Sequence, residues 1–110
     1  MSFPQKVRDI VAHRSQLLCE GCGGSGPLEL HHRQYRSRGG KDTVSNALAL
    51  CGSGNHTGCH GKAHTAAGEA LGWSVRSGFD PRTVPVQRSH GEVWLTDDGR
   101  AVPTDQEVSF

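Results

Sequence analysis

The sequence contains few aromatic residues and no long apolar run. It has two Trp, one Tyr and three Phe among 110 residues, and hydrophobic residues make up only 34% of the chain. No segment is long enough and apolar enough to cross a bilayer as a helix, so no membrane partner is expected. Small chains bury a smaller fraction of their surface than large ones and often depend on a cross-link or a metal. We therefore expect a staple of this kind.

A secretory signal is also missing from the sequence. Residues 1–18 mix charged residues with short apolar pairs and contain no uninterrupted apolar stretch. We therefore expect a cytoplasmic protein. In a reducing compartment, the four cysteines are expected to bind metal rather than to form disulfides.

The chain has little net charge, but its charges are unevenly distributed. The formal charge is +1, from 12 basic and 11 acidic residues, which by itself predicts no partner. Residues 1–41 hold seven of the basic and three of the acidic residues. The densest basic stretch follows two adjacent histidines and contains Arg33, Arg36, Arg38 and Lys41. This stretch predicts a phosphate-binding surface. A solvated arginine-rich loop is the other interpretation, and charge alone does not separate the two.

Hydrophobic periodicity predicts a small α+β domain. We expect a helix over residues 4–18, a short strand at 28–32, an apolar segment at 44–50 and a helix over 60–70. Residues 73–75 and 81–86 look extended, and 92–102 look like a hairpin around an Asp-Asp-Gly turn. We expect one domain over residues 1–110, with its core at about 17–72, an extended hairpin tail at 73–102 and an end at 103–110 that frays.

The four cysteines predict a structural zinc site. Cys19 and Cys22 have the two-residue gap of a zinc knuckle, and Cys51 and Cys59 would supply the other two thiolates. Four thiolates leave no position for water, so such a site would stabilise the fold without taking part in a reaction. Free thiols, a disulfide, or a mixed site in which His56 replaces a cysteine are the alternatives.

Three histidines predict a second metal site. His60 and His64 lie four residues apart on the expected helix, which places both imidazoles on one face. His31 and His32 are adjacent on the expected strand, so their side chains point to opposite faces and serve different tasks. His31 with the helical pair would leave an open coordination position, as in catalytic metal sites. A zinc finger built from the first two cysteines and the helical histidines is disfavoured, because the pairs lie too far apart in the sequence.

Together these residues form a recognisable pattern. It resembles the HNH endonuclease family, in particular the compact phage-type forms with a four-cysteine zinc site. The resemblance covers roughly residues 18–65 and rests on Cys19-x-x-Cys22, Leu30-His31-His32-Arg33, Gly39-Gly40, Asn46, Leu50-Cys51, Cys59-His60 and His64. It implies a zinc-stapled ββα-metal core in which a two-stranded ribbon carries the histidine pair and the asparagine, and a helix carries the last ligands. The N-terminal helix and the C-terminal hairpin would be additions to this core.

The resemblance also implies a role for each residue of the site. His32 would be the general base, and Asn46 would steady the ribbon and orient that base. His31, His60 and His64 would hold one catalytic divalent metal ion. Three imidazoles favour Zn²⁺, Ni²⁺, Co²⁺ or Mn²⁺ over Mg²⁺, which prefers oxygen ligands.

The implied function is metal-dependent hydrolysis of DNA to 5′-phosphate and 3′-hydroxyl ends. The basic stretch would contact flanking phosphates. The resemblance to phage proteins suggests DNA packaging beside a terminase in a bacterial host cell, and it leaves open whether the chain is a monomer or a dimer. A non-catalytic zinc-stabilised nucleic-acid-binding module is the alternative, and an assembly protein with a degenerate nuclease fold is a third.

Overall fold

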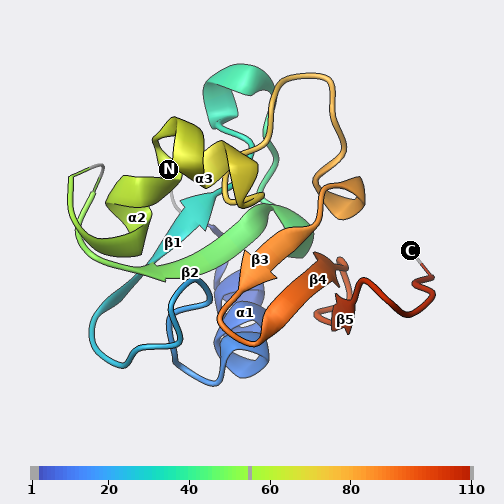
Figure 1. Cartoon of the computed structure of the whole chain (residues 1–110), viewed down its shortest axis with the longest axis horizontal. Coiled ribbons are helices and arrows are strands. Elements are labelled where there is room, and N and C mark those ends of the chain that lie inside the picture. Colours follow the sequence, from blue (N-terminus) through green and yellow to red (C-terminus); the bar gives the residue numbers. More distant parts are fainter. Residues whose placement is uncertain (1–2, 55, 110) are drawn as a thin grey trace.

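The computed structural model in Figure 1 describes residues 3–54 and 56–109. The helices and strands follow one another along the chain in the order α1 (Gln5–Ser15), β1 (Leu28–His32), β2 (Ala47–Cys51), α2 (Gly58–Ala63), α3 (Ala66–Ala70), β3 (Val86–Arg88), β4 (Gly91–Leu95) and β5 (Ala101–Pro103). Single turns of 3₁₀ helix lie at Arg36–Arg38, Val44–Asn46 and Pro81–Thr83. This confirms the α+β class and the ββα order of the core. No helix among these residues is both long enough and apolar enough to span a bilayer.

The strands β1 and β2 form the antiparallel ribbon at the centre of the molecule (Figure 1). In their register His32 faces Ala47, and Leu28 faces Cys51. Successive side chains of a strand point to opposite faces, and β2 is apolar on both. Leu48 and Leu50 therefore enter a core shared with α2 and the C-terminal sheet. Ala47 and Ala49, which alternate with these leucines along β2, enter a second core under α1.

The helix α1 is tied to this ribbon by a buried ion pair. Arg14 donates to both carboxylate oxygens of Glu20, at 2.7 and 2.8 Å, and also to the carbonyls of Val44 and Ala47. Gln16 and the residue after it have φ angles of 56° and 62°, which no α-helix accommodates. The helix therefore ends at Ser15, earlier than the predicted boundary at residue 18.

The C-terminal tail forms a three-stranded antiparallel sheet in the order β3-β4-β5. The predicted hairpin corresponds to β4 and β5, and β3 adds a strand to its edge. Residues 81–83 form a 3₁₀ turn rather than an extended segment, because Asp80 caps the turn and Pro81 fixes its first φ angle. Of the end predicted to fray, Pro103 lies in β5 and Phe110 falls outside the described residues.

Candidate functional site

The four cysteines form one cluster at the base of the ribbon. Their Sγ atoms all lie within 4.8 Å of one another. The Sγ atoms of Cys22 and Cys51 are 3.9 Å apart. A tetrahedral ion with metal–sulfur bonds of roughly 2.3 Å places its sulfurs about 3.8 Å apart. Backbone N–H groups of Cys22 and Cys51 donate to Cys19 Sγ, as is usual around bound thiolates. The cluster therefore has the dimensions of a four-thiolate zinc site.

A glycine-rich loop closes the wide gap between the third and fourth cysteines. Gly52 and Gly58 have φ angles of 102° and 61°, in the region that favours glycine. A Cβ atom on Gly58 would lie 2.7 Å from the carbonyl oxygen of Cys51. This close approach lets the Cys59 N–H donate to Cys51 Sγ at 3.4 Å. The wide spacing between Cys51 and Cys59 is thus compatible with a single four-cysteine site.

The thiols of the cluster oppose one another's ionisation. Burial alone would raise the pKa of Cys19, but N–H donors from Cys22 and Cys51 lower it to about 7. Burial and the neighbouring sulfurs raise the pKa of the Cys59 thiol. All four thiols can lose their protons together only if a cation offsets the resulting charge. His56 is exposed and belongs to neither cluster of candidate metal ligands. The structure therefore does not support a zinc site in which His56 replaces a cysteine.

The three histidines form a second, separate cluster. Ring nitrogens of His31, His60 and His64 also lie within 4.8 Å of one another. His31 Nε2 bonds to the carbonyl oxygen of Trp73 at 2.8 Å and must carry the proton, which leaves Nδ1 as the free ligand atom. His60 Nδ1 bonds to Glu29 at 2.8 Å, which leaves Nε2 free. His64 Nε2 is buried without any hydrogen-bond partner. Such an orphaned nitrogen, beside two free ones, fits a bound divalent cation.

Burial keeps the imidazoles of His31 and His64 in the neutral form that binds metal. It lowers the pKa of His31 to about 3 and lowers that of His64. Both imidazoles are therefore neutral at physiological pH, as metal ligands must be. The predicted helix over residues 60–70 is split into α2 and α3, because Thr65 is extended and caps α3 through its side chain. His64 immediately follows α2 and remains one helical turn from His60, so the ligand pairing survives this correction.

Glu29 is a site residue that the sequence analysis missed. It accepts hydrogen bonds from the Gly54 N–H and from His60 Nδ1, and these hold its pKa below the ordinary value. Such a carboxylate behind a metal-binding histidine fixes the tautomer and the ring orientation. Its position was accessible from the sequence, because Glu29 precedes His31 by two residues on a strand and therefore shares its face.

His32 lies beside the histidine cluster but on the opposite face of β1. A surface hollow is lined by both His31 and His32, together with Tyr35, Arg36, His60 and His64. Asp42 accepts a hydrogen bond from His32 Nε2 at 2.7 Å, and this bond lowers the pKa of Asp42. Asp42 was not among the predicted site residues.

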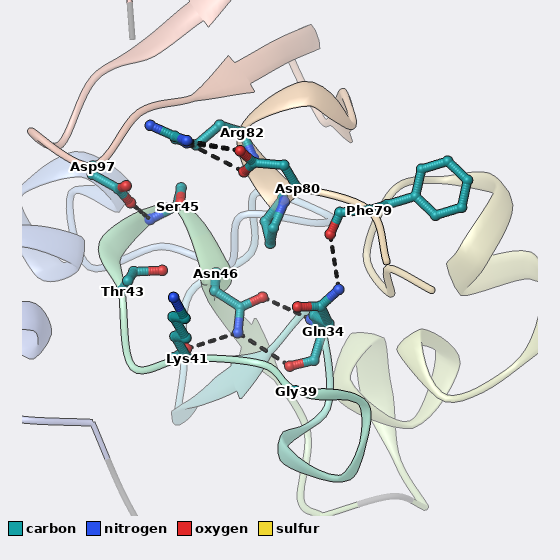
Figure 2. Close-up of a pocket in the computed structure, with 11 residues that line it drawn as sticks. Gln34, Gly39, Lys41, Thr43, Ser45, Asn46, Phe79, Asp80, Arg82 and Asp97 are labelled. Atoms are coloured by element: carbon teal, nitrogen blue, oxygen red, sulfur yellow. Dashed lines mark hydrogen bonds and ion pairs between the residues drawn. The ribbon is translucent and has the colours of Figure 1, made fainter. Parts of the chain in front are cut away.

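Asn46 does not touch His32 directly. It lies in the 3₁₀ turn that leads directly into β2, and its backbone carbonyl accepts the Arg33 N–H at 2.8 Å, at the end of the ribbon. Its side chain bonds to Gln34 and to the Lys41 carbonyl, as Figure 2 shows. A direct contact that orients the base is therefore absent, and Asn46 instead fixes the loop between β1 and β2.

Arg33 is not available to DNA, which corrects its prediction as a phosphate-binding residue. Its side chain is fully buried, and its guanidinium donates to four backbone carbonyls at 2.7 to 3.0 Å. These carbonyls belong to Ser45, Gly72, Pro81 and Val84. Burial lowers the pKa of Arg33 to about 9, which leaves it charged near neutral pH. Arg33 thus joins the ribbon to the C-terminal tail.

The expected result for Arg33→Ala is a loss of about 3–5 kcal/mol in the free energy of unfolding, since four carbonyls lose a buried charged donor. Arg36→Ala is the matched control. The Arg36 side chain is 44% exposed, and its removal should change stability by no more than about 0.5 kcal/mol. Denaturant unfolding measures both. An Arg33→Ala variant that unfolds like the wild type but binds DNA less tightly would restore the original prediction.

Of the other predicted phosphate contacts, Arg36 lines the hollow, whereas Lys41 lines a different pocket beside Asn46. Arg36 and Lys41 are exposed, and Arg36 pairs with Asp42 at 3.1 Å. Arg38 stacks 4.3 Å above the centre of the Tyr35 ring, and that ring stacks on His64 with centroids 5.1 Å apart. Two arginines thus flank the histidines, one beside His32 and one beyond the metal cluster.

Comparison with known proteins shows which part of the chain is similar to a family and to a curated relative. Residues 19–66 match the sequence model of the HNH endonuclease family. The chain is 34% identical over 67 residues to the Type IV methyl-directed restriction enzyme EcoKMcrA of Escherichia coli (strain K12). The match covers 53% of this chain and 22% of the length of that enzyme. No solved structure matches the chain.

Proposed function

We propose that this chain is a metal-dependent endonuclease that hydrolyses phosphodiester bonds in DNA, because residues 19–66 match the HNH endonuclease family. The observation that carries the proposal is the free nitrogen on each of His31, His60 and His64, beside His32 in one hollow. Similarity to a restriction enzyme supports DNA as the substrate. Arg36, Arg38 and Lys41 would bind flanking phosphates, which position a duplex without reading its sequence.

In the proposed reaction His32 is the general base. Its Nε2 is engaged by Asp42, so Nδ1 is the nitrogen that would accept a proton from an attacking water. The water oxygen bonds to phosphorus, the bond to the 3′ oxygen breaks, and solvent protonates the leaving oxygen. The products are a 5′-phosphate and a 3′-hydroxyl.

The three imidazoles would hold the catalytic ion, and the cysteines a structural Zn²⁺. When bound, the catalytic cation supplies positive charge that stabilises the transition state of phosphoryl transfer. An all-nitrogen donor set favours Mn²⁺, Ni²⁺, Co²⁺ or Zn²⁺ over Mg²⁺. Participation in phage DNA packaging beside a terminase stays a prediction from the family resemblance.

A plasmid-cleavage assay tests the proposal. We expect wild-type protein, stripped of its catalytic metal and given Mn²⁺, Ni²⁺, Co²⁺, Zn²⁺ or Mg²⁺, to nick or linearise supercoiled DNA only after the metal returns. His64→Ala is the control, since it removes one ligand at the rim of the site and should abolish cleavage without unfolding the protein. Folded, zinc-loaded wild type that cuts with none of these metals would instead support a nucleic-acid-binding module.

A further inference from the structure

The amide of Asn46 fixes the shape of the loop that follows β1. Asn46 is 1% exposed, and its Oδ1 accepts the Gln34 N–H at 2.7 Å. Its Nδ2 donates to the carbonyls of Gln34 and Lys41, at 3.1 and 2.8 Å. Figure 2 shows the side chain between the two ends of this loop. Asp42 follows Lys41 directly, so the position of the Asp42 backbone depends on Asn46.

The imidazole of His32 is held from two sides. Asp42 Oδ1 lies 2.7 Å from His32 Nε2 at the edge of the ring. Phe3 stacks on the face of the ring, with centroids 3.9 Å apart and planes 16° from parallel. Arg36 Nη1 contacts both oxygens of Asp42, at 3.1 and 3.4 Å, and so limits rotation of the carboxylate. His32 and Asp42 side chains are 15% and 29% exposed, so both remain close to solvent and substrate.

We propose that Asp42 is the residue that positions His32, and that Asn46 acts on the base through Asp42. This inference rests on the proposed nuclease function. A carboxylate facing Nε2 keeps the proton on that nitrogen, because only the protonated nitrogen can donate to it. The lone pair of Nδ1 is then the one presented to water. Asp42 touches neither phosphate nor metal in this arrangement, and its effect is on the tautomer and the direction of the ring.

Two substitutions of Asp42 test this role. Asp42→Ala removes the acceptor, and Asp42→Asn keeps the size while it removes the charge. Asp9→Asn is the matched control, because Asp9 is an exposed carboxylate on α1 whose hydrogen-bond partner, within residues 3–54 and 56–109, is Gln5. We expect kcat of Asp42→Ala to fall by about 10- to 100-fold, which is less than the loss of the base itself would cause. The KM for DNA should stay constant or fall, since a negative charge beside the basic residues is removed.

A spectroscopic measurement separates positioning from a general effect on the loop. The ¹⁵N chemical shifts of the His32 ring distinguish protonated from unprotonated nitrogens at a pH where the ring is neutral. We expect the wild type and Asp9→Asn to carry the proton on Nε2, and Asp42→Ala to show a mixture of tautomers. The catalytic metal content should be equal in all of them. Combining Asn46→Ala with Asp42→Ala should lower kcat by less than the product of the two single effects, because they act along one path.

A failure of the proposed nuclease function can be distinguished from a failure of the positioning role of Asp42. Wild type without metal-dependent cleavage would refute the nuclease, and the ring shifts would then still decide whether Asp42 sets the tautomer. If wild type cleaves and Asp42→Ala cleaves equally fast, Asp42 has no positioning role. Reduced kcat with unchanged ring shifts would also overturn the inference, since Asp42 would then be acting as part of the loop alone.

Discussion

Replacing Cys22 with serine is expected to remove the structural zinc and to destabilise the domain by about 3 kcal/mol or more, because zinc binding at such sites is folding free energy. Cys22 is the exposed member of the cluster, whereas Cys19 is buried in the core beside Leu48 and Trp73. Packing contributes little at an exposed position, where substitutions change stability by no more than about 0.5 kcal/mol. A large loss at Cys22 therefore isolates the contribution of the ion.

Ser25→Ala is a suitable control, since Ser25 is exposed and lies three residues after Cys22. Zinc content is measured by elemental analysis, and the free energy of unfolding by guanidinium titration. Replacement by Co²⁺ reports on the cysteine site separately from the histidine site, because only thiolate ligands give sulfur-to-cobalt charge-transfer absorption. Full removal of zinc from wild type should leave a chain that does not fold, given that net stabilities are typically about 5–15 kcal/mol.

An opposite result would change the account of the fold. If Cys22→Ser unfolds at the same denaturant concentration as wild type, and if wild type given Co²⁺ shows no sulfur-to-cobalt absorption, the cysteines are packing residues. The ribbon would then be stabilised without an ion, by its two apolar cores, by the Arg14–Glu20 ion pair and by the buried hydrogen bonds of Arg33.

The clustering of the candidate ligands could be predicted because it follows local geometry. The two-residue gap of Cys19 and Cys22 is a knuckle in any context, and a four-residue gap brings His60 and His64 together within one helical turn. Alternation along a strand correctly separates His31 from His32. These rules hold even though the predicted helix is split after α2.

The residues that were missed or misassigned depend on contacts between distant segments. Arg33 looks like its exposed neighbours in the sequence, but its four acceptors are backbone carbonyls contributed by the turn before β2 and by the tail. Carbonyls leave no trace in a side-chain pattern. Asp42 follows His32 by ten residues, and the loop shape that Asn46 stabilises brings the two side chains together.

The second large effect is expected for His32→Ala, which should lower kcat by about 10²–10⁴-fold, the usual contribution of a general base. His31, the one proposed metal ligand on β1, points to the opposite face from His32, so metal content should stay at the wild-type level. DNA binding should also persist, since Arg36, Arg38 and Lys41 are untouched. His90→Ala is the control, because His90 is exposed and belongs neither to the histidine cluster nor to the cysteine cluster.

Added imidazole provides a further test of the same variant. Removing the His32 ring opens a space beside Phe3 and Asp42, the two groups that hold it. Free imidazole that enters this space can accept the proton in place of the missing side chain, so it should restore part of the cleavage by His32→Ala and leave His64→Ala inactive. A His32→Ala variant that cleaves at the wild-type rate without imidazole would show that another group activates the water, and Asp42 would then be the first residue to examine.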